Sequence, residues 1–426
     1  MHSFLTKRLS LRVLAFFLFV AGIALLAIPS RAADLALVHA KIYLSPDAPP
    51  IEDGTILIHK GRIRAVGPSN HTKILRLIRR TTVIDCHGKV ITAGFWNSHV
   101  HVLTPVLLHS ELRSNDVVSS ELDQMFTRWG FTTVFDIASI LNNTNAVRRR
   151  IARGEVRGPR ILTVGDPFFP KNGTPIYVRD LWRREKLPSD EIQSIPQAVA
   201  REKRQLAAGA DGVKLFTGAS EANGIVPMPV DAAKALVAEA HRAGKPVFAH
   251  PGNSEGIEIA LGSGVDILAH TTPDGSDWTP ELIARLKSAH MALIPTLTLW
   301  DVEAKRQNLP DGVRKSFIDN GVRQLQAYSQ AGGLVLFGTD AGYISDYDTA
   351  EEFQLMAQAG LTFPQILASM TTNPAGRFGY ARRSGRIAKG MDADLVVLAA
   401  DPAKDITALA RIDRVVRAGR VVYPTY

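Results

Sequence analysis

Cysteine is nearly absent from the sequence, which has 426 residues and a single one, Cys86. An intramolecular disulfide is therefore excluded. Aromatic residues are also few, at 7%, but the hydrophobic content of 46% is enough for a full core. The length suits a barrel of about 250 residues with a smaller module beside it. Cys86 lies in a short strand-like stretch, so we expect a buried structural thiol rather than a nucleophile.

A strong excess of charge is also missing. The formal net charge is +9, and removing the first 32 residues, which hold four basic residues and no acidic one, would leave +5. Basic clusters occur at 76–80, 148–150 and 183–184, without interleaved aromatic residues or a nucleic-acid motif. We interpret them as solvated faces of helices and loops, and expect no nucleic-acid partner.

Residues 1–32 have the composition of a secretory signal peptide. Three basic residues occur among the first 12, an apolar run follows at 13–28, and residues 30–32 fit a cleavage site. The run is shorter than the roughly 20 residues that span a bilayer, so we expect cleavage and no stable membrane anchor afterwards. No cysteine directly follows the run, which argues against a lipoprotein. We therefore predict an exported protein located in a periplasm.

The two ends of the mature chain share one pattern. Residues 33–91 and 377–426 consist of short β-prone runs separated by glycines and turns. Neither end has enough strands for a stable sandwich by itself. We therefore predict that both ends pair into one β-sandwich module, which flanks the domain formed by residues 92–376.

The central region alternates short apolar runs with amphipathic helical stretches. Parallel strands joined by helical crossovers close into a barrel when there are eight of them. The fold class predicted is therefore α/β, a TIM-like (β/α)8 barrel with the flanking β-sandwich. The eight predicted strands are 90–96, 132–135, 161–164, 212–216, 246–249, 265–269, 292–296 and 334–337, and helices are predicted at 196–208, 230–243, 254–261 and 280–289.

One long segment, 165–195, breaks this alternation. It carries several aromatic and proline residues and shows no clear helical or strand period. We expect a structureless stretch. Such a stretch either covers an active site or packs as a surface excursion.

Polar side chains that can bind metal stand in or just after the buried strands. In a parallel barrel the carboxyl ends of the strands converge on one face, where active sites lie. In an extended strand the first and third residues face the same side, so His99 and His101 can point together into the barrel mouth. Imidazole and carboxylate groups gathered there can bind a transition metal. The six candidates are His99, His101, Lys214, His250, His270 and Asp340.

Each candidate also has a plain structural interpretation. Lys214 interrupts an apolar run, so it either pairs with an acidic residue or has reacted with carbon dioxide to form a carbamate. His250 and His270 end strands, where a single histidine is more often structural than a ligand. Asp340 is either a helix N-cap or a carboxylate that binds metal and accepts a proton. The clustering of all six favours a metal-dependent hydrolase.

Four segments together resemble the amidohydrolase superfamily. Residues 90–101 are similar to its first barrel strand with the His-x-His motif, and 130–136 to its second. Residues 371–375 resemble the closing helix of its barrel, and 385–398 its return into the β-sandwich. The set of histidines, lysine and aspartate resembles the imidazolonepropionase-like and Xaa-Pro dipeptidase-like group.

The resemblance implies a site with two metal ions. His99, His101 and Asp340 would hold the more buried ion, His250 and His270 the other, and carboxylated Lys214 would bridge them. Zinc suits imidazole and carboxylate ligands, so we expect two Zn²⁺ per chain. The expected reaction is hydrolysis of an amide or peptide-like C–N bond by a metal-bound hydroxide. Asp340 would act as general base and then as general acid on a small-molecule or dipeptide-like substrate.

Two other functions fit the same residues. One is a mononuclear deaminase or cyclic amidase, which an unmodified Lys214 would favour. The other is an exported binding protein that uses the same fold without catalysis. All six positions hold chemically competent residues, which argues against that second possibility.

Overall fold

The computed structural model describes residues 34–71, 81–221, 224–272 and 278–424. The predicted signal peptide, 1–32, lies outside these residues. Within them, no helix is both long and apolar enough to cross a membrane.

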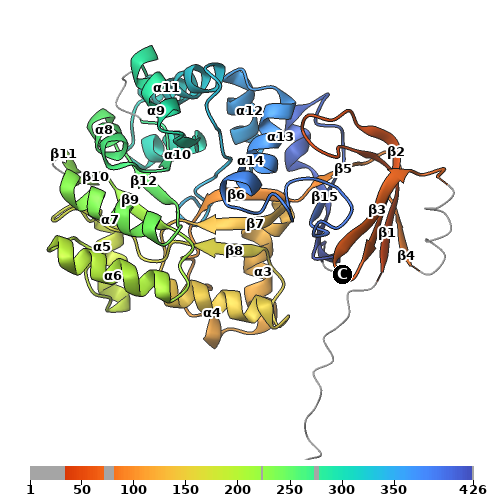
Figure 1. The fold of residues 1–426 in the computed structure, drawn as a ribbon, viewed down its shortest axis with the longest axis horizontal. Helices are drawn as coiled ribbons and strands as arrows, with labels where there is room; N and C mark the ends of the chain where they lie inside the picture. Colours follow the sequence, from red (N-terminus) through yellow and green to blue (C-terminus); the bar gives the residue numbers. More distant parts are fainter. Residues whose placement is uncertain (1–33, 72–80, 222–223, 273–277, 425–426) are drawn as a thin grey trace, which may run out of the picture.

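Both ends of the chain build a single eight-stranded sheet (Figure 1). Its strand order is β17-β16-β15-β5-β1-β2-β3, with β4 paired to β1. β5 pairs in parallel with β1 and antiparallel with β15, so the N-terminal and C-terminal strands are joined directly. The predicted sandwich of both chain ends is confirmed. The strands are β1 (Leu35–Ile42), β2 (Ile51–His59), β3 (Arg62–Pro68), β4 (Thr82–Asp85), β5 (Val90–Ala93), β15 (Leu395–Leu398), β16 (Ile412–Arg417) and β17 (Arg420–Tyr423).

This sheet has its own apolar core, which includes Cys86. The thiol is 1% exposed and has no disulfide partner. Burial raises its pKa to about 11, so the thiolate, the reactive form, is disfavoured. The predicted buried structural thiol is confirmed.

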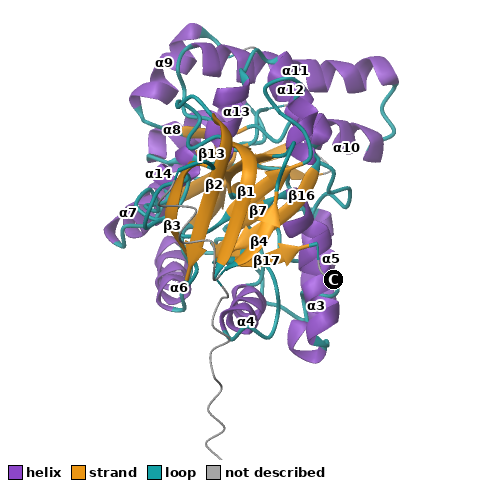
Figure 2. Ribbon diagram, turned by 90° about the vertical axis from the view of Figure 1, so that its right-hand side faces the viewer, coloured by secondary structure: helices purple, strands orange, loops and turns teal. Residues whose placement is uncertain are grey.

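The strands of the barrel form two parallel groups. Figure 2, which looks onto the eight-stranded sheet, shows helices around the strands. One group is β6-β7-β8 and the other is β14-β13-β12-β9. The strands are β6 (Phe95–Val100), β7 (Phe131–Asp136), β8 (Arg160–Thr163), β9 (Val213–Phe216), β12 (Val247–His250), β13 (Ile267–Ala269) and β14 (Ala292–Ile294), and β10 (Gly218–Glu221) and β11 (Gly224–Pro227) form a separate hairpin.

Most helices follow the strands as crossovers. The sequence predicted four of them, α6 to α9, to within two residues at each end. The helices are α3 (Asn115–Met125), α4 (Leu141–Ala152), α5 (Ile176–Glu185), α6 (Ile195–Ala207), α7 (Val230–Arg242), α8 (Ser254–Ser263), α9 (Pro280–Ser288), α10 (Thr298–Arg306), α11 (Asp311–Gln330), α12 (Ala350–Gln358), α13 (Phe363–Met370) and α14 (Thr372–Arg377), with short 3-10 turns at Ser110–Leu112, Thr127–Trp129 and Ile406–Ala410.

The eighth predicted strand, 334–337, joins the two groups. The Leu336 amide donates to the Leu293 carbonyl at 2.9 Å, and the Ser98 amide donates to the Phe337 carbonyl at 2.7 Å. The segment therefore lies between β14 and β6, although only Val335 forms a bridge in the strand pattern. The predicted TIM-like barrel is confirmed.

The prediction of one barrel strand over 90–96 is wrong. The chain changes sheet at Gly94, whose amide donates to Asp394 of the eight-stranded sheet, while the next amide, of Phe95, donates to Gly130 at the entrance to β7. A Cβ at Gly94 would lie 2.2 Å from the Thr132 hydroxyl, so no side chain fits there. A continuous apolar run thus conceals two strands, because both are buried on both faces.

The prediction of a structureless 165–195 is also wrong, since α5 occupies its centre. The Trp182 indole donates to Asp190 at 2.6 Å, and Asp190 in turn pairs with Arg201 of α6. Trp182 is the one buried residue of α5, so the helix lacks the broad apolar face that a sequence pattern reveals. Phe168 and Phe169 are each 1% exposed and anchor the segment to the core.

Candidate metal centre

The six predicted residues lie at or near the carboxyl ends of the barrel strands. His99 is the fifth residue of β6, His101 directly follows that strand, and His250 ends β12. His270 comes one residue after β13, and Asp340 follows the closing segment 334–337. Lys214 is the second residue of β9, deeper in the barrel.

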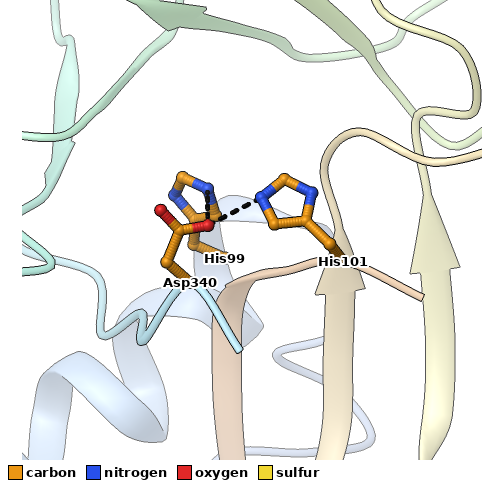
Figure 3. A group of neighbouring side chains, drawn as sticks. All are labelled: His99, His101 and Asp340. Carbon is orange, nitrogen blue, oxygen red and sulfur yellow. Dashed lines mark ion pairs between the residues drawn. The ribbon is translucent and has the colours of Figure 1, made fainter. Parts of the chain in front are cut away.

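His99, His101 and Asp340 form a tight group (Figure 3). The Nε2 atoms of His99 and His101 lie 3.2 and 2.7 Å from the same carboxylate oxygen, Oδ1 of Asp340. One ligand atom from each of the three residues lies within 4.8 Å of the others. Two imidazole nitrogens and a carboxylate oxygen at this spacing can hold a transition-metal ion.

His270 and His250 extend the group. Nε2 of His270 is 3.9 Å from the other oxygen of Asp340, and its ring lies 4.5 Å from that of His99. The ring of His250 is 5.0 Å from that of His270 and stacks on Phe216 at 4.8 Å. The structure therefore brings all four histidines around the Asp340 carboxylate. Among the described residues, the ligand atoms that lie close enough to share one metal ion belong to His99, His101 and Asp340.

Lys214 is buried beside this group, at 1% exposure. Its Nζ lies 5.4 Å from the centre of the Phe216 ring. Burial lowers the pKa of Lys214 to about 7, against the opposing attraction of Asp340. A substantial fraction of the amine is therefore neutral near neutral pH, which a carbamate requires.

Hydrogen bonds to the far side of two rings orient the histidines. Nδ1 of His101 lies 2.7 Å from the Ala138 carbonyl, and Nδ1 of His270 contacts the Thr296 hydroxyl. Such partners commonly fix the rings of metal-binding histidines. Sequence reasoning missed both, because Ala138 acts through its backbone and Thr296 lies on a different strand end.

The backbone is strained at the same place. Asp340, His270 and Thr296 all have positive φ, of 59°, 102° and 44°. Residues with side chains rarely adopt this region, and such strain gathers at functional sites. No sequence signal announces these positions, because none of them is glycine.

A buried aspartate at the end of β7 supports the centre and was not among the candidates. Asp136 is 0% exposed and accepts hydrogen bonds from Thr144 at 2.8 Å and Thr163 at 2.9 Å. It also accepts from the Val102 amide, directly after His101. Its oxygens are thus occupied by the protein, so it holds the loop that carries His101.

The charge balance in the centre fits a cation. A carbonyl only accepts, so Nδ1 of His101 carries the hydrogen, and in the neutral ring Nε2 holds a lone pair. That lone pair faces a carboxylate oxygen 2.7 Å away, an arrangement that needs a proton or a metal ion between the atoms.

The pKa values of the other side chains also suit metal binding. Burial lowers the pKa of His99 to about 4 and of His250 to about 3, so both rings are uncharged at neutral pH and can donate a lone pair to a metal ion. The surrounding histidines hold the pKa of Asp340 well below its usual range despite its burial.

The sequence matches the profile of the Amidohydrolase family over residues 90–422. The chain belongs to this family. The expected membership is confirmed, and with it the class of enzyme, a metal-dependent hydrolase of C–N bonds with a site of two histidines and an aspartate.

Two curated relatives show how far the similarity extends. An uncharacterised protein of Mycobacterium tuberculosis is 26% identical over 246 residues, which are 55% of this chain and 63% of that protein. The chain thus matches less than two thirds of this relative's length. The imidazolonepropionase of Thermoplasma acidophilum is 26% identical over 412 residues, covering 88% of this chain and 91% of that enzyme.

Solved structures share the whole fold. A protein from Bifidobacterium longum, provisionally described as a prolidase, is 26% identical with a TM-score of 0.76, and covers 92% of this chain and 95% of its own. A Xaa-Pro dipeptidase with bound methionine is 21% identical with a TM-score of 0.75, and covers 91% and 99%. A prolidase complexed with N-methylphosphonate-L-proline is 22% identical with a TM-score of 0.74, also covering 91% and 99%.

Proposed function

We propose that the protein is an exported two-zinc hydrolase that cleaves the amide bond of a dipeptide-like substrate. The observation that carries this proposal is the convergence of two imidazole nitrogens on one oxygen of Asp340 at the mouth of the barrel. His250, His270 and Lys214 lie around it and supply the remaining donors for a second ion.

The ligand assignment follows from position. His99, His101 and Asp340 would hold the first zinc ion, and His250 and His270 the second. Lys214, once carboxylated, would bridge the two. When bound, the ions supply Lewis acidity, which can lower the pKa of water to about 7 and polarise a carbonyl.

Asp340 is the residue suited to moving the proton. The surrounding histidines hold its pKa well below the usual range, so the carboxylate is ionised at neutral pH. The Asp340 side chain is 3% exposed, so it is shielded from bulk water. It would take a proton from the attacking water and deliver it to the leaving nitrogen.

The rim of the centre contains an aromatic pair that could contact the substrate. Tyr343 comes three residues after Asp340, and its amide donates to the Asp340 carbonyl at 3.1 Å. Its ring lies 5.1 Å from that of Tyr177, which α5 brings from the segment 165–195. Tyr177 is 50% exposed, so its ring can meet an entering molecule. This position supports a covering role for the segment.

The similarity to prolidases supports a dipeptide with proline in second place as the first substrate to test. The experiment is a turnover assay of zinc-loaded protein with Xaa-Pro dipeptides, other dipeptides, cyclic amides and esters. We expect hydrolysis of dipeptides at a rate that falls when the metal is removed by chelation. Turnover of esters alone, or of no compound in the panel, would overturn the proposed amidase activity.

A one-metal cyclic amidase is the second candidate. Only His99, His101 and Asp340 place their ligand atoms together among the described residues, and this favours a single ion. The similarity to an imidazolonepropionase, which extends over most of both chains, favours a cyclic amide substrate. One zinc ion per chain, with turnover of a cyclic amide and of no dipeptide, would establish this candidate instead.

Export rests on residues 1–32 alone, which lie outside the described part. We expect the protein recovered from a periplasmic fraction to begin at Ala33, as measured by mass spectrometry of the intact chain. An N-terminus at Met1 in the cytoplasmic fraction would contradict export.

A further inference from the structure

A cavity opens at the opposite end of the barrel from the metal centre. Its volume is about 380 Å³, and arginine side chains from three different elements line it. Arg148 comes from α4, Arg160 begins β8, and Arg417 ends β16 of the eight-stranded sheet. The cavity therefore lies where the amino ends of the barrel strands meet the sheet.

Positive charge exceeds negative charge around this cavity. Asp392 lies within 3.0, 2.9 and 3.5 Å of guanidinium nitrogens of Arg160, Arg383 and Arg62. One carboxylate thus serves three arginines. Asp211 pairs with Arg148 at 3.2 Å, and Asp394 lies 4.0 Å from Arg160 and also acts on Arg417. Three carboxylates therefore face five guanidinium groups, those of Arg62, Arg148, Arg160, Arg383 and Arg417.

Two guanidinium nitrogens of arginines that line the cavity lack a hydrogen-bond acceptor. They are Nη1 of Arg160 and Nε of Arg417, and both are shielded from solvent. A buried donor without an acceptor lowers the stability of the folded state. Burial also lowers the pKa of Arg417 despite the nearby aspartates.

The remainder of the wall suits a carbon skeleton. Tyr380 lines the cavity and stacks under Arg160, whose guanidinium carbon is 5.1 Å from the ring centre. Ile151, Pro159 and Leu162 add apolar surface. The volume exceeds what a bare oxyanion fills, so a ligand can carry an apolar body beside its charged group.

We propose that this cavity is a binding site for a small organic oxyanion, a phosphate or carboxylate group attached to an apolar or aromatic body. The oxyanion accepts from Arg160 and Arg417, for which planar guanidinium groups are well suited. Its body lies against Tyr380 and the apolar wall. The site is independent of the metal centre, so it does not rest on the proposed hydrolase function.

The test is isothermal titration of metal-loaded full-length protein at constant ionic strength. The probes are phenyl phosphate, benzoate and the uncharged benzyl alcohol. Arg417→Met removes one unpaired donor. Ala152→Trp fills the cavity from an exposed position on its wall, where a large side chain does not disturb the core. Arg153→Met is the matched control, because it removes the same charge from a neighbouring exposed residue that does not line the cavity.

We expect saturable binding of phenyl phosphate, benzoate or both, and none of benzyl alcohol. Whichever anion binds more tightly identifies the head group. Arg417→Met and Ala152→Trp should each weaken binding about tenfold or more, which corresponds to about 1.4 kcal/mol, while Arg153→Met leaves it unchanged. Binding that is equally strong in all variants would place the anion elsewhere, such as the metal centre, and would overturn the proposal. Equal weakening in all three, or no binding by the unmodified protein, would also overturn it.

Discussion

At the mouth of the barrel, several imidazole groups face one carboxylate, whereas at its base five guanidinium groups surround three carboxylates. The mouth leaves lone pairs directed at a negative oxygen, 2.7 Å apart in the case of His101 and Asp340. At the base, Asp392 is surrounded by three positive charges. The mouth thus needs a proton or a metal ion between these atoms, while the base has excess positive charge.

The two ends also differ in backbone strain. Asp340 and His270, both at the mouth, have positive φ. At the base, Arg160 and Arg417 belong to regular strands. Backbone strain of this kind indicates a site kept for function at a cost in stability. Changes at the mouth should therefore alter activity, and changes at the base should alter stability.

The largest effect should come from Asp340→Asn. The amide cannot accept the proton of the attacking water, so we expect kcat to fall by roughly 10²–10⁴-fold. The amide oxygen still accepts, so much of the metal should remain, as measured by mass spectrometry of bound metal. The control is Asp346→Asn, at an exposed position of the same loop. Full activity of Asp340→Asn would refute the proton-transfer role.

Lys214→Ala should remove the bridge between the ions. We expect about one zinc ion per chain instead of two, and loss of most turnover, part of which returns when a small carboxylate such as acetate is added. Lys234→Ala, which changes an exposed lysine on α7, should leave both quantities intact. Unchanged metal content and activity in Lys214→Ala would show that the lysine is not a bridge.

Gly94→Ala tests the junction at the base. The added methyl group would lie 2.2 Å from the Thr132 hydroxyl, so we expect a loss of about 2–3 kcal/mol in the free energy of unfolding. Gly376→Ala is the control, because a Cβ there has no neighbour within 4 Å. Urea denaturation measures both. Equal stability of the two variants would mean that the change of sheet at Gly94 tolerates a side chain.

Asp392→Asn should weaken the arginine network at the base without affecting the mouth. Asp392 is 8% exposed but its arginine partners are more accessible, so we expect a loss of about 1–2 kcal/mol in stability and an unchanged kcat. Asp405→Asn, which weakens an exposed pair with Arg411, should lower the free energy of unfolding less than Asp392→Asn does. A large fall in kcat for Asp392→Asn would show that the two ends are coupled.

A further prediction concerns how the free energy of unfolding depends on pH. Burial raises the pKa of Glu352 from 4.5 to about 7, against hydrogen bonds from Thr298 and the Leu297 amide. The folded state therefore binds this proton more tightly than the unfolded state, so Glu352 lowers stability as pH rises from about 4.5 to about 7. Glu352→Gln should remove that slope, measured by urea denaturation across this range. An identical slope in the variant would contradict the assignment.

The sequence predicted the fold class and the close grouping of His99, His101 and Asp340, because both depend on local patterns. The metal-binding roles of Lys214, His250 and His270 stay predictions. A histidine or aspartate at the end of a buried strand is visible in the sequence, and parallel strands place such ends together. The change of sheet at Gly94 was not visible, because β5 and β6 form one apolar run. The helix α5 was not visible, because it buries only Trp182.

The arginine network at the base was beyond sequence reasoning for another reason. Arg160 and Asp392 are separated by 232 positions and pair only because the C-terminal sheet packs against the barrel. Likewise, Thr296 reaches His270 from a neighbouring strand end, and a backbone carbonyl orients His101. Long-range partners of this kind have no sequence pattern, so the structure is needed to find them.

The most direct test of the metal centre is the zinc content of purified protein, expressed with zinc and bicarbonate. The account predicts about two ions per chain, and about one in Lys214→Ala. One ion per chain in the unmodified protein would replace the bridged centre by the mononuclear candidate. A folded protein that binds no metal at His99, His101 and Asp340 would contradict the central claim.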